Sequence, residues 1–282
     1  MVTDVIVDIE TGDPDDAMTV VFMAAHPRVN LRAVTVHPGT RAQVGFYRKL
    51  LGQLGHEGVP IGAAKPDHPK KCVSSFYYGW LGDFKDDTAD GLGWQVIGEY
   101  PEATVICGGP LFNLDAAFAH DKSVDDVVIQ GGFCGDNLVA PGNRLPKFAG
   151  KVTCPTYNLN GNPKAALRVL ARETPRRTLV GKNICHGIMY DHELHKKVRE
   201  QKWMKPLYDG MDYYLSKHPE GKKFHDPFAA CVALNRDICT LVEAEVYREK
   251  GMWGSRLRQG TNTYVAVAHD YEVFLRTFLD VA

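Results

Sequence analysis

The sequence predicts an α/β fold, in which a single domain holds a mainly parallel central sheet flanked by helices. Short apolar runs of strand length alternate along the chain with longer amphipathic stretches, which is typical of β-α-β units. The 282 residues include 44% hydrophobic residues, enough to build a sizeable core. Neither an internal repeat nor a low-complexity linker interrupts the chain. We therefore expect one domain over residues 1–282.

Strands and helices are expected to alternate from the first residues onward. Each expected strand is a short apolar run, and each expected helix carries apolar residues along one face. The first helix has Pro14 in its first turn, where a proline fits without loss of a hydrogen bond. In chain order we expect a strand at 5–7, a helix at 14–25, a strand at 31–36, a helix at 41–54, a strand at 103–107, a helix at 111–119 and a strand at 126–130.

The last part of the chain has a β-rich composition. Gly251, Gly254 and Gly260 interrupt it, which favours hairpins over further β-α-β units. Residues 65–90 and 138–153 are expected to be long loops, which are often functional. In chain order we expect a helix at 163–172, strands at 177–180, 241–248, 253–258 and 263–268, and a closing helix at 271–279.

Charge and cysteine content exclude several classes of protein. With 33 basic and 34 acidic residues the net charge is -1, so no overall field would attract a nucleic acid or an anionic membrane. The N-terminus has no signal-like pattern, and no apolar run reaches the length of a membrane span. The seven cysteines contain no pair separated by two residues, which indicates reduced thiols. We expect a cytoplasmic protein.

Five carboxylates are crowded into nine residues between the first strand and the first helix: Asp8, Glu10, Asp13, Asp15 and Asp16. Asp13 suits the N-cap of the helix, and the two acidic residues that follow suit its positive end. Capping therefore explains two or three of these carboxylates, but it does not explain five.

A bound cation is the simplest explanation for the remaining carboxylates. Like charges at this spacing raise one another's pKa unless a positive group lies among them, and residues 5–26 contain neither Lys nor Arg. Oxygen ligands favour Ca²⁺ or Mg²⁺ over zinc, and a flexible loop favours Ca²⁺. We therefore expect a Ca²⁺ site, with Mg²⁺ as the alternative.

A second candidate segment lies far downstream, in KKFHDPFAACVAL. His225 and Asp226 precede an apolar helix that begins at Pro227. On its own this pair would be interpreted as a helix cap with an exposed histidine. Together with the acidic cluster, Asp226 becomes a candidate metal ligand and His225 a candidate acid.

The order of short motifs along nearly the whole chain resembles the nucleoside hydrolase family. The motifs are VDIETGDPDDA, AVTVHPGT, DGLG, CGGPLFNLDAA, VVIQGGFCGDN, YNLNGNPKAA, NICHG and HDP. The resemblance implies a single α/β domain that cleaves the N-glycosidic bond of a ribonucleoside or related ribosyl compound with a bound Ca²⁺ and a water. It also implies a small nucleoside-like substrate and a possible homo-dimer or tetramer.

The resemblance implies a set of metal ligands. Asp16 matches the last Asp of the family motif, and Asp226 matches its distant partner. A backbone carbonyl at Cys134 or Gly135 would complete the set. Glu10 stands where the family has an Asp, with one extra residue in the loop, and is expected to be both ligand and general base. Asp8 or Asp13 remain alternatives for the base.

The resemblance also implies the substrate contacts. Asp15 and Asn158 match residues that contact the ribose, and His225 matches the His near the leaving base. Thr40 occupies the place of a sugar-binding Asn, and Thr156 the place of an acidic residue two positions before Asn158. Because these departures fall on sugar and base contacts, we expect a modified sugar, a modified base or a larger ribosyl compound as substrate.

Two other functions are compatible with the same residues. The fold could bind a nucleoside or ribosyl ligand without turnover, because several family residues are replaced. The segment VDIET also faintly resembles the nucleophile loop of haloacid-dehalogenase-like phosphatases, although Glu10 stands where that chemistry needs an Asp. The aromatic segment 74–84 is expected either to cover the site or to pack locally, and His186 and Tyr190 are candidates to reach the pocket.

Overall fold

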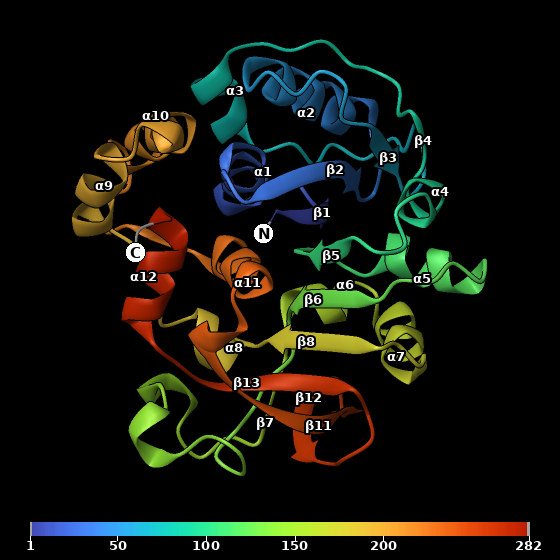
Figure 1. Cartoon of the computed structure of the whole chain (residues 1–282), viewed down its shortest axis with the longest axis vertical. Helices are drawn as coiled ribbons and strands as arrows, with labels where there is room; N and C mark the ends of the chain where they lie inside the picture. Colours follow the sequence, from blue (N-terminus) through green and yellow to red (C-terminus); the bar gives the residue numbers. More distant parts are fainter. Residues whose placement is uncertain (1, 281–282) are drawn as a thin grey trace.

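The computed structural model describes residues 2–280, whose centre is an eleven-stranded sheet (Figure 1). The strand order is β4-β3-β2-β1-β5-β6-β8-β13-β11-β12-β7. Every neighbouring pair from β4 to β13 is parallel, and the remaining pairs are antiparallel. The mainly parallel α/β fold expected from the sequence is confirmed, and so is the hairpin near the C-terminus, formed by β11 and β12.

All eight strands expected from the apolar runs are present, and five short strands, β3, β4, β7, β9 and β10, are additional. A separate two-stranded sheet pairs β9 with β10. The strands are β1 (Thr3–Ile9), β2 (Val29–Val36), β3 (Ile61–Ala63), β4 (Gly91–Leu92), β5 (Thr104–Cys107), β6 (Asp126–Gln130), β7 (Thr153–Cys154), β8 (Arg176–Val180), β9 (Met189–Tyr190), β10 (Lys222–Lys223), β11 (Cys239–Glu249), β12 (Met252–Leu257) and β13 (Thr263–His269).

The helices include several that the sequence pattern did not reveal. Those of the expected α/β units, α1, α2, α5, α7 and α12, begin and end within one residue of the expected bounds. The helices are α1 (Pro14–Ala25), α2 (Arg41–Gln53), α3 (Ser75–Leu81), α4 (Gly93–Gly98), α5 (Phe112–Ala119), α6 (Tyr157–Gly161), α7 (Pro163–Ala171), α8 (Lys182–Cys185), α9 (His192–Arg199), α10 (Lys205–Leu215), α11 (His225–Leu234) and α12 (Tyr271–Leu279).

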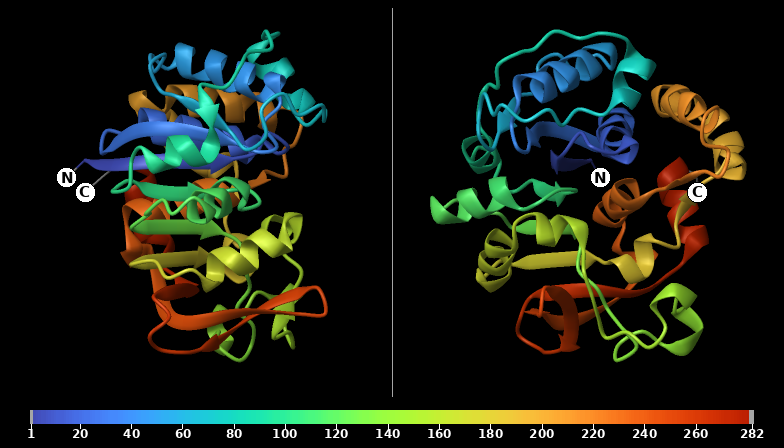
Figure 2. Two further views of the ribbon diagram at one scale, coloured as in Figure 1. Left: turned by 90° about the vertical axis from the view of Figure 1, so that its right-hand side faces the viewer. Right: turned by 180° about the vertical axis from the view of Figure 1, so that it is seen from behind.

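Helices cover both faces of the sheet, which is why its central strands are apolar on both sides (Figures 1 and 2). In β1, Val5, Val7 and Ile9 pack into one apolar core with α1, α2, α11 and α12. Ile6 points the other way, into a second core with α4, α5 and α7. Within residues 2–280, no helix has the length and apolar character of a membrane span.

The carboxyl ends of the central parallel strands meet at one edge of the sheet. Glu10 follows β1, Gly108 follows β5, and Gly131 follows β6. Ligands of parallel sheets gather at this edge. The starts of α1 and α11 are also brought together here, although more than two hundred residues separate them in the chain.

Candidate active site

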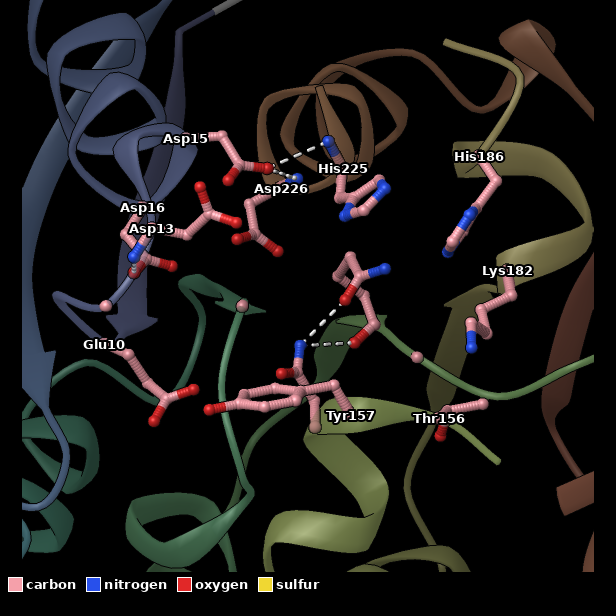
Figure 3. A pocket seen from close by; sticks show the side chains of 15 residues that line it. Glu10, Asp13, Asp15, Asp16, Thr156, Tyr157, Lys182, His186, His225 and Asp226 are labelled. Carbon is pink, nitrogen blue, oxygen red and sulfur yellow. Dashed lines mark hydrogen bonds between the residues drawn. The ribbon is translucent and has the colours of Figure 1, made fainter. Parts of the chain in front are cut away.

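A cavity of about 460 Å³ opens at this edge of the sheet (Figure 3). Its wall combines the end of β1, the start of α1, the segments after β5 and β6, and the starts of α6, α8 and α11. The lining residues are Glu10, Gly12, Asp13, Asp15, Asp16, Gly108, Gln130, Gly131, Thr156, Tyr157, Asn158, Lys182, His186, His225 and Asp226.

Most of the residues singled out from the sequence line this one cavity. They are Glu10, Asp15, Asp16, Asn158, His225 and Asp226, and they come from three separate segments of the chain. His186 also lines the cavity, whereas Tyr190 is buried away from it and hydrogen-bonds with His195. The structure thus brings together the two acidic segments that the sequence analysis links.

Thr40 and Cys134 do not line the cavity. The Thr40 side chain caps α2, where its hydroxyl accepts a hydrogen bond from the backbone N–H of Gln43 at 3.1 Å. Cys134 is buried beyond the end of β6, and its backbone N–H donates to Asn183 Oδ1 at 3.0 Å. Gln130 and Gly131, at the end of β6, line the cavity at this point.

Asp15 joins the starts of α1 and α11. Its Oδ2 accepts hydrogen bonds from the backbone N–H groups of His225 at 3.0 Å and Asp226 at 3.3 Å. Its Oδ1 lies 3.1 Å from the ammonium of Lys222, which also pairs with Asp13 at 3.0 Å. Lys222 therefore supplies a positive charge that the local sequence of the acidic cluster lacks.

Asp16 and Asp226 are buried side by side at the base of the cavity. Burial first, and then the charge of Asp15, raise the pKa of both carboxyl groups well above their usual value. The backbone N–H of Asp13 donates to Asp16 Oδ2 at 2.9 Å. Among the described residues, Asp226 Oδ1 has no hydrogen-bond partner. Two buried carboxylates so placed require either protons or a cation.

The pair of carboxylates fits a hard divalent cation. The donors are oxygens, one of them buried without a partner, which is what Ca²⁺ or Mg²⁺ binds. Across residues 2–280, no three His, Cys, Asp or Glu side chains converge enough to hold a metal ion by themselves. Asp16 and Asp226 would therefore hold the ion together with backbone carbonyls, water or substrate hydroxyls, which provide the remaining ligands of many such sites.

Of the three candidate bases, Glu10 and Asp13 reach the cavity and Asp8 does not. Asp8 is 1% exposed, behind the wall, where it accepts hydrogen bonds from Thr35 and Asn113, both at 2.8 Å. Burial raises the pKa of Glu10 to about 7. Asp13 is held in its ion pair with Lys222.

Aromatic side chains support the acidic loop from outside the cavity. The hydroxyl of Tyr47 donates to the backbone carbonyl of Glu10 at 2.7 Å, and that of Tyr77 donates to the carbonyl of Asp13. Tyr77 also stacks on Phe46, with ring centroids 4.2 Å apart. Of the two interpretations of segment 74–84, the structure therefore favours local packing.

Asn158 is oriented by the end of β6. Its Nδ2 donates to the backbone carbonyl of Gln130 at 3.0 Å and to the Gln130 side chain at 2.7 Å (Figure 3). These bonds occupy the amide nitrogen and leave Oδ1 to face the cavity. Gln130 was not among the residues predicted from the sequence, because only its position at the end of a strand marks it.

Two histidines form the wall opposite the acidic loop. The rings of His186 and His225 stack with centroids 4.8 Å apart. Burial lowers the pKa of His225 to about 4 and that of His186 to about 3. Both imidazoles are therefore neutral near pH 7, and His225 Nε2 has no hydrogen-bond partner among the described residues.

Comparison with known proteins gives a consistent match. The family described as "Inosine-uridine preferring nucleoside hydrolase" matches residues 5–276. An uncharacterized protein of Aquifex aeolicus is 26% identical over 97% of this chain and 99% of its own length. The pyrimidine-specific ribonucleoside hydrolase RihA of Photobacterium profundum is 23% identical over 92% of this chain and 86% of its own. The solved plant nucleoside hydrolase PpNRh1 is 22% identical, with a TM-score of 0.76 over 99% of this chain and 98% of that one.

Proposed function

The chain belongs to the inosine-uridine preferring nucleoside hydrolase family, whose members cleave N-ribosyl bonds, and from this premise we propose a Ca²⁺-dependent hydrolysis of a ribonucleoside or related ribosyl compound. One observation carries the proposal. Two buried carboxylates, Asp16 and Asp226, share a cavity with the sugar-contacting candidates Asp15 and Asn158. Ca²⁺ is favoured because its ligand shell is large and adaptable, and Mg²⁺ is the alternative.

The reaction places opposite demands on the two ends of the substrate. Cleavage builds positive charge on the ribosyl group and negative charge on the departing base. A Ca²⁺ held by Asp16 and Asp226 would orient a water and lower its pKa. The carboxylates nearby would stabilise the positive ribosyl group. A neutral donor near the base would stabilise the leaving group.

Glu10 is the residue that we assign as general base. A carboxylate whose pKa is about 7 accepts a proton more readily than an ordinary glutamate does. Asp13 is the weaker candidate because Lys222 pairs with it, and Asp8 is separated from the cavity. Asp15 and Asn158 would accept hydrogen bonds from ribose hydroxyls with the oxygens that face the cavity.

We assign His225 to the leaving base. Because its imidazole is neutral near pH 7, it would donate a single N–H to the departing base rather than act as an imidazolium. Its unpartnered Nε2 is the atom available for this contact. Tyr157, which is 80% exposed, stands at the mouth of the cavity where a base would enter.

Replacing His225 by Ala is expected to depend on the leaving group. Loss of a donor to the base should lower kcat/KM about 100-fold for a natural nucleoside, the scale of one acid-base contact. For p-nitrophenyl riboside, whose leaving group needs no proton, the loss should be only a few-fold. Steady-state kinetics on both substrates measure the difference, and equal losses on both would contradict the assignment.

Adding Ca²⁺ is expected to stabilise the protein, and more so at higher pH. Cations and protons compete for carboxylates, and burial raises the pKa of Asp16 and of Asp226 well above the usual value. The rise in Tm on adding Ca²⁺ should therefore be small at about pH 5.5 and larger at about pH 8. Thermal scans with Ca²⁺ or EDTA measure it. A shift that is constant across this range would place the cation elsewhere.

Release of free base is the direct test of activity. The purified protein with Ca²⁺ is incubated with inosine, uridine, adenosine and nucleosides with modified sugars or bases, and the products are separated by chromatography. Free base with wild type and none with Asp16→Asn is the expected result. Ligand-induced stabilisation without any release of base would instead favour the alternative, a ribosyl-binding protein without turnover.

A further inference from the structure

The cavity is electrically divided into two halves. In Figure 3 the carboxylates of Asp15, Asp16 and Asp226 lie on one side, and Lys182 and His186 lie on the other. The acidic half is accounted for by a cation and ribose hydroxyls. A neutral nucleoside gives no comparable reason for an ammonium group in the opposite wall.

Among the described residues, the lysines on this side of the cavity form no ion pair with a carboxylate. Lys182 Nζ donates to the backbone carbonyl of Pro155 at 2.9 Å. Lys147 contacts His186 Nδ1, and burial followed by the charge of Lys223 lowers the pKa of the Lys147 ammonium. In the part of the chain that the structure describes, the lysines that form ion pairs are Lys196, Lys205 and Lys222. We call Lys182 and the neutral His186, which line the cavity, together with Lys147 and Lys223, which do not line it, the basic wall.

A second and independent feature points to a ligand beside Lys182. Thr156 is 2% exposed and lines the cavity, yet its Oγ1 has no hydrogen-bond partner within residues 2–280. A buried hydroxyl without a partner costs free energy unless something in the cavity accepts from it.

The cavity also adjoins a second hollow. A neighbouring hollow of about 530 Å³ shares Glu10, Thr156, Tyr157 and Lys182 with it, and adds Lys70 and His37. Lys70 likewise lies outside the ion pairs named above. A substituent of the substrate would therefore pass from one hollow to the next beside the residues that both hollows share.

We propose that Thr156 and Lys182, backed by the rest of the basic wall, bind an anionic group carried by the ribosyl substrate, either a phosphate or a carboxylate. The proposal rests on the proposed ribosyl hydrolysis and narrows its substrate class. Lys182 supplies the charge and Thr156 a directed hydrogen bond, a combination that suits oxyanions. The anionic group takes no part in bond cleavage. It positions the substrate with its ribose toward Asp15 and Asp16.

The test compares binding of two pairs of probes that differ by one anionic group. Ribose 5-phosphate and ribose test a phosphate on the sugar, and orotate and uracil test a carboxylate on the base. Titration calorimetry on the wild type should show at least about tenfold tighter binding of the anionic member of one pair, the scale of a charge-assisted hydrogen bond. The pair that shows the preference identifies the source of the anion.

Variants assign that preference to the basic wall. Lys182→Met and Thr156→Val should each reduce it to about threefold or less. Lys197→Met, on the exposed face of α9, should leave it unchanged. If Lys182→Met does not fold, Lys182→Gln is measured in its place. As a further check, the preference of the wild type for the anionic probe should be lost at high salt.

Two results would overturn the proposal. One is an equal affinity of the wild type for the anionic and the neutral probe in both pairs. The other is a preference that requires Ca²⁺ and survives Lys182→Met and Thr156→Val, because the cation would then hold the anion. Since these measurements need no turnover, a protein that binds ribose 5-phosphate but releases no base would refute the proposed hydrolysis and not the anion site.

Discussion

Asp226→Asn is expected to lower kcat/KM for ribosyl hydrolysis at least about 1000-fold, the scale of losing a buried electrostatic contact in the transition state. The change removes one of two buried carboxylates at the base of the cavity and keeps its shape. Loss of the Ca²⁺-induced rise in Tm should accompany the loss of activity. Kinetics and thermal scans with Ca²⁺ or EDTA measure the two effects on the same preparation.

The same variant should be more stable than the wild type when no metal is present. Burial raises the pKa of Asp226, so the folded state holds its proton to higher pH than the unfolded chain does. That contribution to stability is lost as pH rises, whereas the amide does not titrate. The advantage of Asp226→Asn in EDTA should therefore grow with pH.

Asp237→Asn is the matched control for Asp226→Asn. Asp237 is exposed in the same segment of the chain, and its replacement should change neither activity nor Tm appreciably. An Asp226→Asn protein that retains Ca²⁺-induced stabilisation and near-normal activity would contradict the role that we assign to this carboxylate.

Lys222→Met is expected to destabilise the fold by about 3–5 kcal/mol, because removing one partner of a buried ion pair leaves the other charge uncompensated. The Lys222 side chain is 8% exposed and Asp15 is 2% exposed. Burial lowers the pKa of Lys222, but the charges of Asp15 and Asp13 raise it by more. Urea unfolding of wild type and variant measures the difference.

Two controls separate this effect from a general loss of charge. Lys196→Met removes an exposed pair with Glu193 and should cost less than about 0.5 kcal/mol. Adding Asp15→Asn to Lys222→Met should cost less than the sum of the two single changes, because the uncompensated charge disappears. A loss below about 1 kcal/mol for Lys222→Met would mean that the pair is solvated.

The regular α/β units could be predicted because their signals are local. Pro14 and the acidic first turn mark the start of α1, and the apolar run 126–130 marks β6. By contrast, α3 lies within a segment read as a loop, because its aromatic residues are placed by contacts with α2 and α10 rather than by helical periodicity. There the local sequence pattern predicts a loop, whereas the packing of the aromatic side chains against α2 and α10 stabilises a helix.

The residues of the acidic half of the site could be predicted from the sequence, whereas most of the residues that surround them could not. Glu10, Asp15 and Asp16 are adjacent in sequence, whereas Lys222 reaches them only after the chain has folded. Its one signal was its position three residues before His225. The resemblance places Thr40 at a sugar-binding position, but its hydroxyl accepts a hydrogen bond at the N-terminus of α2.

The most direct test of the central claim is a crystal structure of the protein with Ca²⁺ and ribose. We expect Ca²⁺ bound by Asp16 and Asp226, with ribose hydroxyls between the ion, Asp15 and Asn158. Carboxylates that stay protonated and empty at saturating Ca²⁺, with ribose absent or bound elsewhere, would contradict the account. The acidic loop would then be a structural joint between α1 and α11 rather than a catalytic site.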